Sequence, residues 1–252
     1  MRGIATKRDF LLDPRWKAVL HWLYGCQTTF ACGGLAAIDV DCDDTMIDRL
    51  MLYVEELERW NPVYGLVNAS GDDLVIKHVL DSLAPFRIVE SLLREYEEAH
   101  DKGQPATVSD LGSGAGLPGI PLSIIFPDHP FLLYERMDKR VRFLETEKIT
   151  LGLVNVEICE AETSQPIKPY EVAVFRAFRP FSETKLFRAI WKNTDNGGAL
   201  MAYKGKLLNA QLELEGLKSD QILAVAGNRA QVLPIWVPFL DEERCVIVMR
   251  KT

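Results

Sequence analysis

The chain has 252 residues, of which 48% are hydrophobic and 26% are charged, and it carries a formal net charge of −7. This composition is typical of a globular protein and excludes a disordered or low-complexity chain. The acidic balance excludes a protein that coats nucleic acid through its overall field, so any contact with RNA requires a local basic face.

We predict that residues 1–104 form a helical segment. The apolar stretch from Trp16 to Ile38 is interrupted by charged and polar side chains and by glycines. A membrane-spanning helix needs a longer uninterrupted apolar run. We therefore expect a buried helical or irregular lobe here and no association with a membrane.

Three helices are expected between about residue 43 and residue 100, because apolar residues recur there at spacings of three and four. Asp43 and Asp44 stand where a helix N-terminus favours acceptors and negative charge. Pro62 and Gly65 are expected to end this first helix. The second helix is expected to begin near Asp72, and the third covers residues 88–100.

From residue 105 to residue 252, predicted strands and helices alternate. The strands are expected at 106–111, 131–135, 154–159, 172–175, 198–203 and 245–249. The helices are expected at 117–126, 138–151 and 182–191. This alternation predicts a doubly wound, mostly parallel α/β sheet of Rossmann-like type, with the N-terminal helices as a cap.

The five cysteines contain no Cys-x-x-Cys pair, so no metal site is expected. Their odd number and the lack of a secretory signal favour reduced thiols. The sequence therefore predicts a cytoplasmic protein, which we expect to be a monomer.

A glycine-rich segment follows the first predicted strand, at the carboxyl edge of the sheet where such folds bind ligands. It contains two overlapping patterns. Gly114-x-Gly116-x-x-Gly119 matches the dinucleotide fingerprint of nicotinamide and flavin enzymes. Asp110-x-Gly112-x-Gly114-x-Gly116 resembles the first motif of S-adenosylmethionine methyltransferases. The glycines by themselves do not decide between a dehydrogenase and a methyltransferase.

The acidic residues that flank the loop favour the methyltransferase. Asp110 would repel a pyrophosphate, whereas S-adenosylmethionine carries a sulfonium and an ammonium that tolerate an acid nearby. Glu135 follows the second strand, where an acid accepts hydrogen bonds from ribose hydroxyls in both classes. An NAD(P)-dependent oxidoreductase and a non-catalytic RNA-binding protein on the same fold remain the alternatives.

Six short motifs in the same order make a family resemblance specific. They are Trp60-Asn61, Lys77-His78-Val79-Leu80-Asp81-Ser82-Leu83, Gly116-Leu117-Pro118-Gly119-Ile120-Pro121-Leu122, Lys139-Arg140-Val141-Arg142-Phe143-Leu144, Arg176-Ala177-Phe178 and Tyr203-Lys204-Gly205. Together they resemble the bacterial 16S ribosomal RNA guanine-N7 methyltransferases, also called the glucose-inhibited division protein B family. The likeness runs from about Thr45 to about Lys206.

The resemblance implies an enzyme that uses S-adenosylmethionine to methylate a guanosine in 16S ribosomal RNA or the small ribosomal subunit. The family's cofactor contacts carry over to Gly112, Leu117, Ala161, Glu162 and Arg176. With the residues of the loop and the acid after the second strand, the expected cofactor site is Asp110, Gly112, Gly114, Gly116, Leu117, Glu135, Ala161, Glu162 and Arg176.

No catalytic base is predicted, because guanine N7 already carries an in-plane lone pair that can attack a methyl group. Alignment of the reacting atoms is then the main task of the enzyme. Arg176 is the candidate positioning residue, although a surface arginine is the alternative. His78 lies among apolar residues of its helix and is interpreted as structural.

A local basic face is predicted despite the negative net charge. Its members are Arg136, Lys139, Arg140, Arg142, Lys204 and Lys206. They lie on the second crossover helix and at strand ends, beside the expected ligand edge. Contact with RNA phosphates and an ordinary solvated helix face are both compatible with this pattern.

Overall fold

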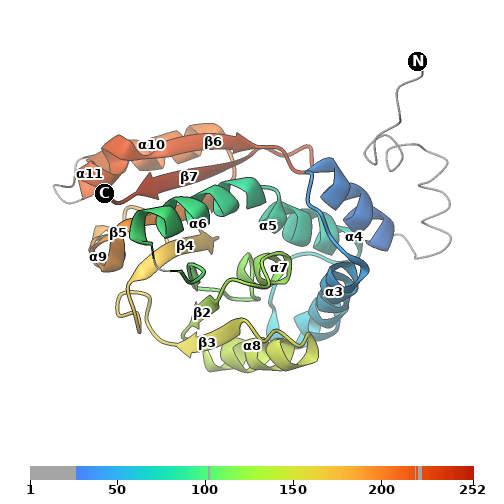
Figure 1. Ribbon diagram of the computed structural model, residues 1–252. Coiled ribbons are helices and arrows are strands. Elements are labelled where there is room, and N and C mark those ends of the chain that lie inside the picture. Colours follow the sequence, from blue (N-terminus) through green and yellow to red (C-terminus); the bar gives the residue numbers. More distant parts are fainter. Residues whose placement is uncertain (1–26, 102, 219, 221–222) are drawn as a thin grey trace, which may run out of the picture.

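A mixed seven-stranded sheet forms the centre of the molecule in the computed structural model, which describes residues 27–101, 103–218, 220 and 223–252 (Figure 1). The strand order is β3-β2-β1-β4-β5-β7-β6. The strands are β1 Val108–Leu111, β2 Phe131–Glu135, β3 Val156–Glu160, β4 Tyr170–Arg176, β5 Thr194–Lys204, β6 Gln231–Ile235 and β7 Arg244–Arg250. The first five strands are parallel, and β7 runs antiparallel to both β5 and β6.

Helices cover both faces of the sheet. The helices are α3 Asp44–Tyr64, α4 Asp72–Leu74, η1 Val75–Leu80, α5 Asp81–Leu83, α6 Phe86–His100, α7 Gly119–Ile125, α8 Asp138–Thr150, α9 Thr184–Asn193, α10 Leu207–Lys218 and α11 Leu223–Arg229. One apolar cluster joins the elements from α3 to α8 to one face, and a second joins α9, α10 and α11 to the other. This confirms the predicted doubly wound fold with a helical cap.

The predicted elements are confirmed with shifts of a few residues at their ends, and β2 begins and ends as predicted. The sequence did not predict α10, α11 or β6. Leucines are spread around α10, at 207, 208, 212, 214 and 217, and give no single apolar face. Pro234 lies inside β6, which is tolerated because β6 is the last strand of the sheet.

The first cap helix, α3, begins and ends with the expected chemistry. The side chain of Asp43 accepts a hydrogen bond from the amide of Met46 at 2.8 Å. Gly65 adopts a left-handed conformation with φ of 59°, and its amide bonds to the carbonyl of Asn61. Pro62 lies inside the helix rather than ending it. The helix continues for two more residues because Gly65 supplies the turn that stops it.

The second predicted helix is present, but its middle is a π-helix of six residues, η1, between the short helices α4 and α5. A π-turn widens the helix and is frequent at functional sites. Residues 77 and 78 of η1 and residue 81 of α5 all bond to Arg176 of β4. The functional consequence appears at Arg176.

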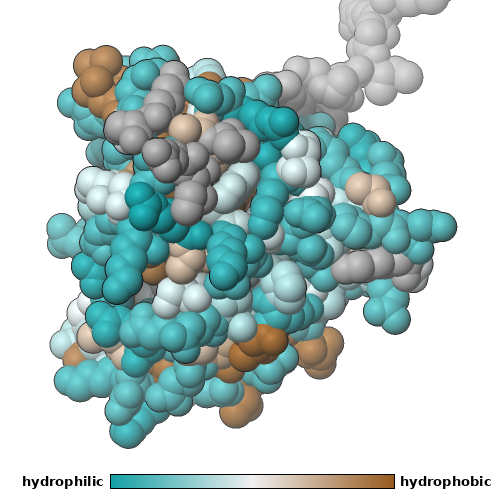
Figure 2. Space-filling model, turned by 90° about the vertical axis from the view of Figure 1, so that its left-hand side faces the viewer, coloured by the Kyte–Doolittle hydropathy of each residue, from teal (hydrophilic) through white to brown (hydrophobic). Residues whose placement is uncertain are grey.

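Residues 27–37 form a helix with Ala31 and Leu35 buried, whereas residues 16–26 of the predicted apolar lobe lie outside the described residues. None of the described helices is long and apolar enough to cross a bilayer. The part of the chain that the structure describes also holds no group of three metal-binding side chains. Figure 2 shows one face of the molecule, where hydrophilic residues predominate and hydrophobic ones form small separate groups.

The division into a helical segment, 1–104, and a sheet domain, 105–252, stays a prediction. One core cluster contains Leu57 and Val89 of the cap together with Val108 and Phe131 of the sheet. The cap and this face of the sheet therefore share one hydrophobic core.

Candidate functional site

Asp110, in β1, stabilises the glycine-rich loop that follows this strand through hydrogen bonds. This side chain is fully buried, and its Oδ2 accepts hydrogen bonds from the hydroxyl of Ser113 at 2.6 Å and the amide of Gly119 at 3.0 Å. A Cβ at Gly119 would lie 2.6 Å from that oxygen, so only glycine permits this approach. Burial raises the pKa of Asp110 to about 6. Asp110 therefore shapes the loop from beneath.

Glu135, at the end of β2, holds the same loop from the side. Its Oε2 accepts from the amide of Gly114 at 3.0 Å, and its Oε1 accepts from the amides of Arg136 and Met137 at 2.8 and 2.9 Å. The carboxylate thus joins the glycine loop to the start of α8. Each carboxylate oxygen has two lone pairs, so Oε2 keeps capacity for a further donor.

A first cavity of about 570 Å³ opens over this loop. Sequence-predicted residues in its wall are Gly112, Glu135, Arg136, Arg140, Ala161 and Glu162. Gly112 has φ of 71°, and a Cβ there would lie 2.7 Å from the ring of Phe178. The structure therefore brings together Gly112 of the loop, Glu135 and the two residues after β3, as the sequence predicts.

Four predicted residues in and around the loop, Asp110, Gly114, Gly116 and Leu117, are not in that wall, and neither is Arg176, which is described below. Asp110 lies under the loop, and Leu117 is buried with 5% of its surface exposed. A Cβ at Gly116 would meet the side chain of Ile120 at 2.3 Å, so Gly116 serves packing within the loop. Direct cofactor contacts from these residues stay a prediction; the structure places Asp110, Gly116 and Leu117 in the support of the loop.

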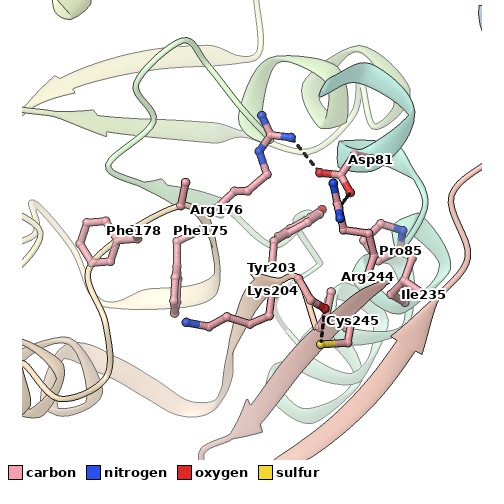
Figure 3. A pocket seen from close by; sticks show the side chains of 13 residues that line it. Asp81, Pro85, Phe175, Arg176, Phe178, Tyr203, Lys204, Ile235, Arg244 and Cys245 are labelled. Carbon is pink, nitrogen blue, oxygen red and sulfur yellow. Dashed lines mark hydrogen bonds and ion pairs between the residues drawn. The ribbon is translucent and has the colours of Figure 1, made fainter. Parts of the chain in front are cut away.

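A second, smaller cavity of about 320 Å³ adjoins the first, and Ala177 and Phe178 line both (Figure 3). Ala177 has a positive φ of 50°, which a non-glycine residue adopts at a cost in energy. This bend after β4 places Arg176 in the wall of the second cavity and not in that of the first. Lys204, predicted as an RNA contact, also lines the second cavity.

Arg176 is fixed by three partners of the cap, two in the π-helix η1 and one at the start of α5. Its guanidinium donates to Oδ2 of Asp81 at 2.9 Å, to the carbonyl of Lys77 at 3.0 Å and to Nδ1 of His78 at 2.9 Å. The other oxygen of Asp81 accepts from Nε of Arg244 at 3.1 Å. Arg176, with 15% of its side chain exposed, is thus a half-buried member of a network and not a free arginine on the surface.

His78 serves this network as an acceptor. Burial, and after it the charge of Arg176, lowers the pKa of His78 to about 4, so the ring is neutral at neutral pH. Its Nε2 is buried and has no hydrogen-bond partner among the described residues. The sequence predicts a structural role for His78 and no catalytic one. It does not predict Asp81 or Arg244 as residues of the site. These two lie 163 positions apart, and no local pattern links them.

The predicted basic face is divided between exposed and paired side chains. Arg136, Lys139, Arg142 and Lys206 are exposed, and Arg136 also lies 3.7 Å from Glu162. Arg140 lies 3.8 Å from Glu135, and Lys204 pairs with Glu213 at 2.6 Å. Of the exposed members, Arg136 lines the first cavity, Lys139 and Arg142 lie on α8, and Lys206 follows β5.

Comparison with known proteins gives a consistent result. The family model described as rRNA small subunit methyltransferase G matches residues 46–227. Ribosomal RNA small subunit methyltransferase G of Bordetella avium (strain 197N) is 32% identical over 208 residues, which cover 81% of this chain and 85% of that protein. The protein of that name from Borrelia turicatae (strain 91E135) is 34% identical over 188 residues, 73% of this chain and 84% of its own.

Among solved structures, the human methyltransferase 10 domain containing protein aligns with a TM-score of 0.53 and covers 81% of this chain and 99% of its own. At 15% identity, this likeness shows the fold alone. The family match and the relatives together decide against the oxidoreductase alternative and confirm the resemblance seen in the sequence. The chain belongs to the rRNA small subunit methyltransferase G family.

Proposed function

We propose that this chain transfers the methyl group of S-adenosylmethionine to N7 of a guanosine in 16S ribosomal RNA. The observation that carries the proposal is the first cavity, which opens over the glycine-rich loop with Glu135 in its wall, in a chain of this family. We also propose that it acts as a cytoplasmic monomer. Three of its described cysteines, Cys32, Cys159 and Cys245, are free thiols, in keeping with a reducing compartment.

The residues of the first cavity fit S-adenosylmethionine. Gly112 leaves the backbone open to the cavity, where a side chain would meet Phe178. Glu135 offers a carboxylate for ribose hydroxyls, and Ala161 and Glu162 line the wall after β3. Bound there, the cofactor supplies an activated methyl group on a sulfonium. On transfer the sulfur–methyl bond would break and the N7–methyl bond would form, so the purine would gain a positive charge and no proton would leave.

The chain then has to align the acceptor and exclude water, and it needs no general base. His78 is neutral and already accepts from Arg176, and a guanidinium does not act as a base. These two residues therefore support geometry. The exposed cations beside the cavities supply the local basic face that RNA phosphates require.

Transfer of a labelled methyl group tests the proposal. The purified protein is incubated with labelled S-adenosylmethionine and either protein-free 16S RNA or assembled small subunits, and the RNA is then digested to nucleosides. We expect label in 7-methylguanosine in at least one arm. Binding of RNA without transfer in both arms would instead support the non-catalytic alternative.

A further inference from the structure

The second cavity lies where the carboxyl ends of β4 and β5 meet the start of β7 and the turn after α5 (Figure 3). Ala177 and Phe178 separate it from the first cavity and line both. A group held in the second cavity therefore lies beside a group held in the first. An acceptor and a methyl donor need this arrangement.

The walls of the second cavity combine aromatic rings with cationic donors. Phe175, Phe178 and Tyr203 provide the apolar part, and Arg176 and Arg244 provide guanidinium groups. Figure 3 shows Arg176, Asp81 and Arg244 meeting on one side of the cavity, with Phe178 on the other. Aromatic faces stack on nucleobases, and N–H donors pair with acceptors such as O6 of guanine. A nucleobase turned out of its stack fits this chemistry better than a phosphate alone would, because a phosphate does not use the aromatic wall.

Asp81 organises the charged side of the cavity. Its carboxylate is nearly buried, with 9% of the side chain exposed, and each oxygen holds one arginine, Arg176 at 2.9 Å and Arg244 at 3.1 Å. The two guanidinium groups come from β4 and β7, which are not neighbours in the sheet. Without the carboxylate they would repel each other. Asp81 also offsets one of the two positive charges beside a base that becomes cationic on methylation.

We propose that the second cavity binds the acceptor guanine base and that Asp81 is a positioning residue that holds Arg176 and Arg244 against it. This inference rests on the proposed methyl transfer to guanine N7. It adds the binding site of the acceptor base, and it gives Asp81 a role that Asp81 performs through Arg176 and Arg244.

The first test is Asp81→Asn, measured by calorimetry for S-adenosylmethionine and by steady-state methylation for RNA. We expect the cofactor affinity to stay within about twofold of wild type, because Asp81 does not line the first cavity. Loss of alignment should lower kcat/KM for RNA by about 10-fold to 100-fold. Asp81→Glu keeps the charge and should recover part of that loss. A general structural role would instead lower the affinity for both ligands and would not distinguish Asn from Glu.

The second test leaves the charged network intact. Gly205 lines the second cavity and is exposed, and a Cβ built there meets no atom within 4 Å, so Gly205→Leu adds bulk from a position that is open at Cβ. Gly216 in α10 has the same free space and lies outside both cavity walls, so Gly216→Leu is the matched control. We expect Gly205→Leu to raise the KM for RNA or to abolish transfer, with cofactor affinity unchanged, and Gly216→Leu to match wild type.

The outcomes separate the two proposals. Absence of transfer to guanine N7 by the wild-type protein overturns the proposed function and the cavity assignment with it. Transfer by wild type together with unchanged kcat/KM in Gly205→Leu and in folded Asp81→Asn overturns the cavity assignment alone. A selective loss in both variants, with the cofactor still bound, supports it.

Discussion

Asp110 and Glu135 are both acidic residues at the ends of neighbouring strands, but the structure gives them different tasks. Asp110 is fully buried and orders the loop through Ser113 and Gly119. Glu135 stands in the cavity wall and ties Gly114 to the start of α8. Asp110, which the sequence associates with the positive charges of the cofactor, therefore stabilises the loop. Glu135 lies where it can contact a ligand.

Gly112→Ala tests the position of the cofactor. The new methyl group must take a φ of 71° and displace Phe178, so we expect S-adenosylmethionine to bind at least about tenfold more weakly, or about 1.4 kcal/mol. Gly152→Ala is the matched control, because Gly152 has φ of 62° and free space for a Cβ away from both cavities. Calorimetry on both folded variants gives the answer. Equal affinities in the two would remove Gly112 from the binding site.

His78→Gln tests the mechanism without a base. The amide oxygen of glutamine can accept from Arg176 as Nδ1 does, so we expect most of the turnover to remain. The pKa of His78 is about 4, so this ring gives no limb to the wild-type profile at neutral pH. Single-turnover methylation from about pH 5.5 to about pH 8 measures both effects. A large loss in the variant together with disappearance of a limb near the ordinary histidine pKa of about 6.5 would show that a base is required.

The cap helices contribute more to the site than their sequence pattern predicts. The π-helix η1 brings Lys77 and His78, and the start of α5 brings Asp81, to one guanidinium. In α3, the hydroxyl of Tyr53 donates to the carbonyl of Ala115 in the glycine loop at 2.6 Å. Periodicity predicted both helices, but it does not report a widened turn or a long-range hydrogen bond. The position of the glycine loop, by contrast, was predicted because the loop is one short run of residues.

The contact between α3 and α8 contains a buried carboxyl group. Glu147 is fully buried, and neither of its oxygens has a hydrogen-bond partner among the described residues. Burial, and after it the charge of Glu56, raises the pKa of Glu147 to about 8. The folded protein therefore keeps a proton that the unfolded chain loses above the ordinary value of 4.5. Stability falls as the pH rises between these two values.

Glu147→Gln should remove this dependence. Relative to wild type, we expect the free energy of unfolding of the variant to rise with pH by up to about 1.4 kcal/mol for each pH unit in that range. Denaturant unfolding at several pH values measures it. Glu145→Gln is the control, because Glu145 is exposed on the same helix and undergoes the same substitution. Parallel pH profiles for wild type and Glu147→Gln would show that this carboxyl group is charged in the fold.

At the scale of the whole molecule, a net charge of −7 opposes association with RNA, yet the family acts on it. The two facts are compatible because electrostatic interactions in salt solution have a short range. Exposed charges are screened beyond about 8 Å at physiological salt, so at contact the local cations outweigh the distant acids. The sequence could place these cations beside the site because they follow strand ends. It could not place the second cavity, whose wall combines residue 81 with residues 176, 205 and 244.

Reversing two exposed charges on α8 tests the RNA face. Arg140 is unsuitable because it lies 3.8 Å from Glu135 in the cofactor cavity, so the sharper pair is Lys139→Glu with Arg142→Glu. We expect weaker RNA binding and a salt dependence reduced by about 0.7 in slope for each phosphate that the variant no longer neutralises. Cofactor affinity should stay unchanged, because neither side chain lines the first cavity. The control is Arg59→Glu with Arg94→Glu, two exposed arginines on the cap that change the net charge equally. If both double variants lower the slope alike, the effect belongs to net charge and α8 is an ordinary solvated helix. If only the α8 pair lowers it, those cations bind RNA phosphates.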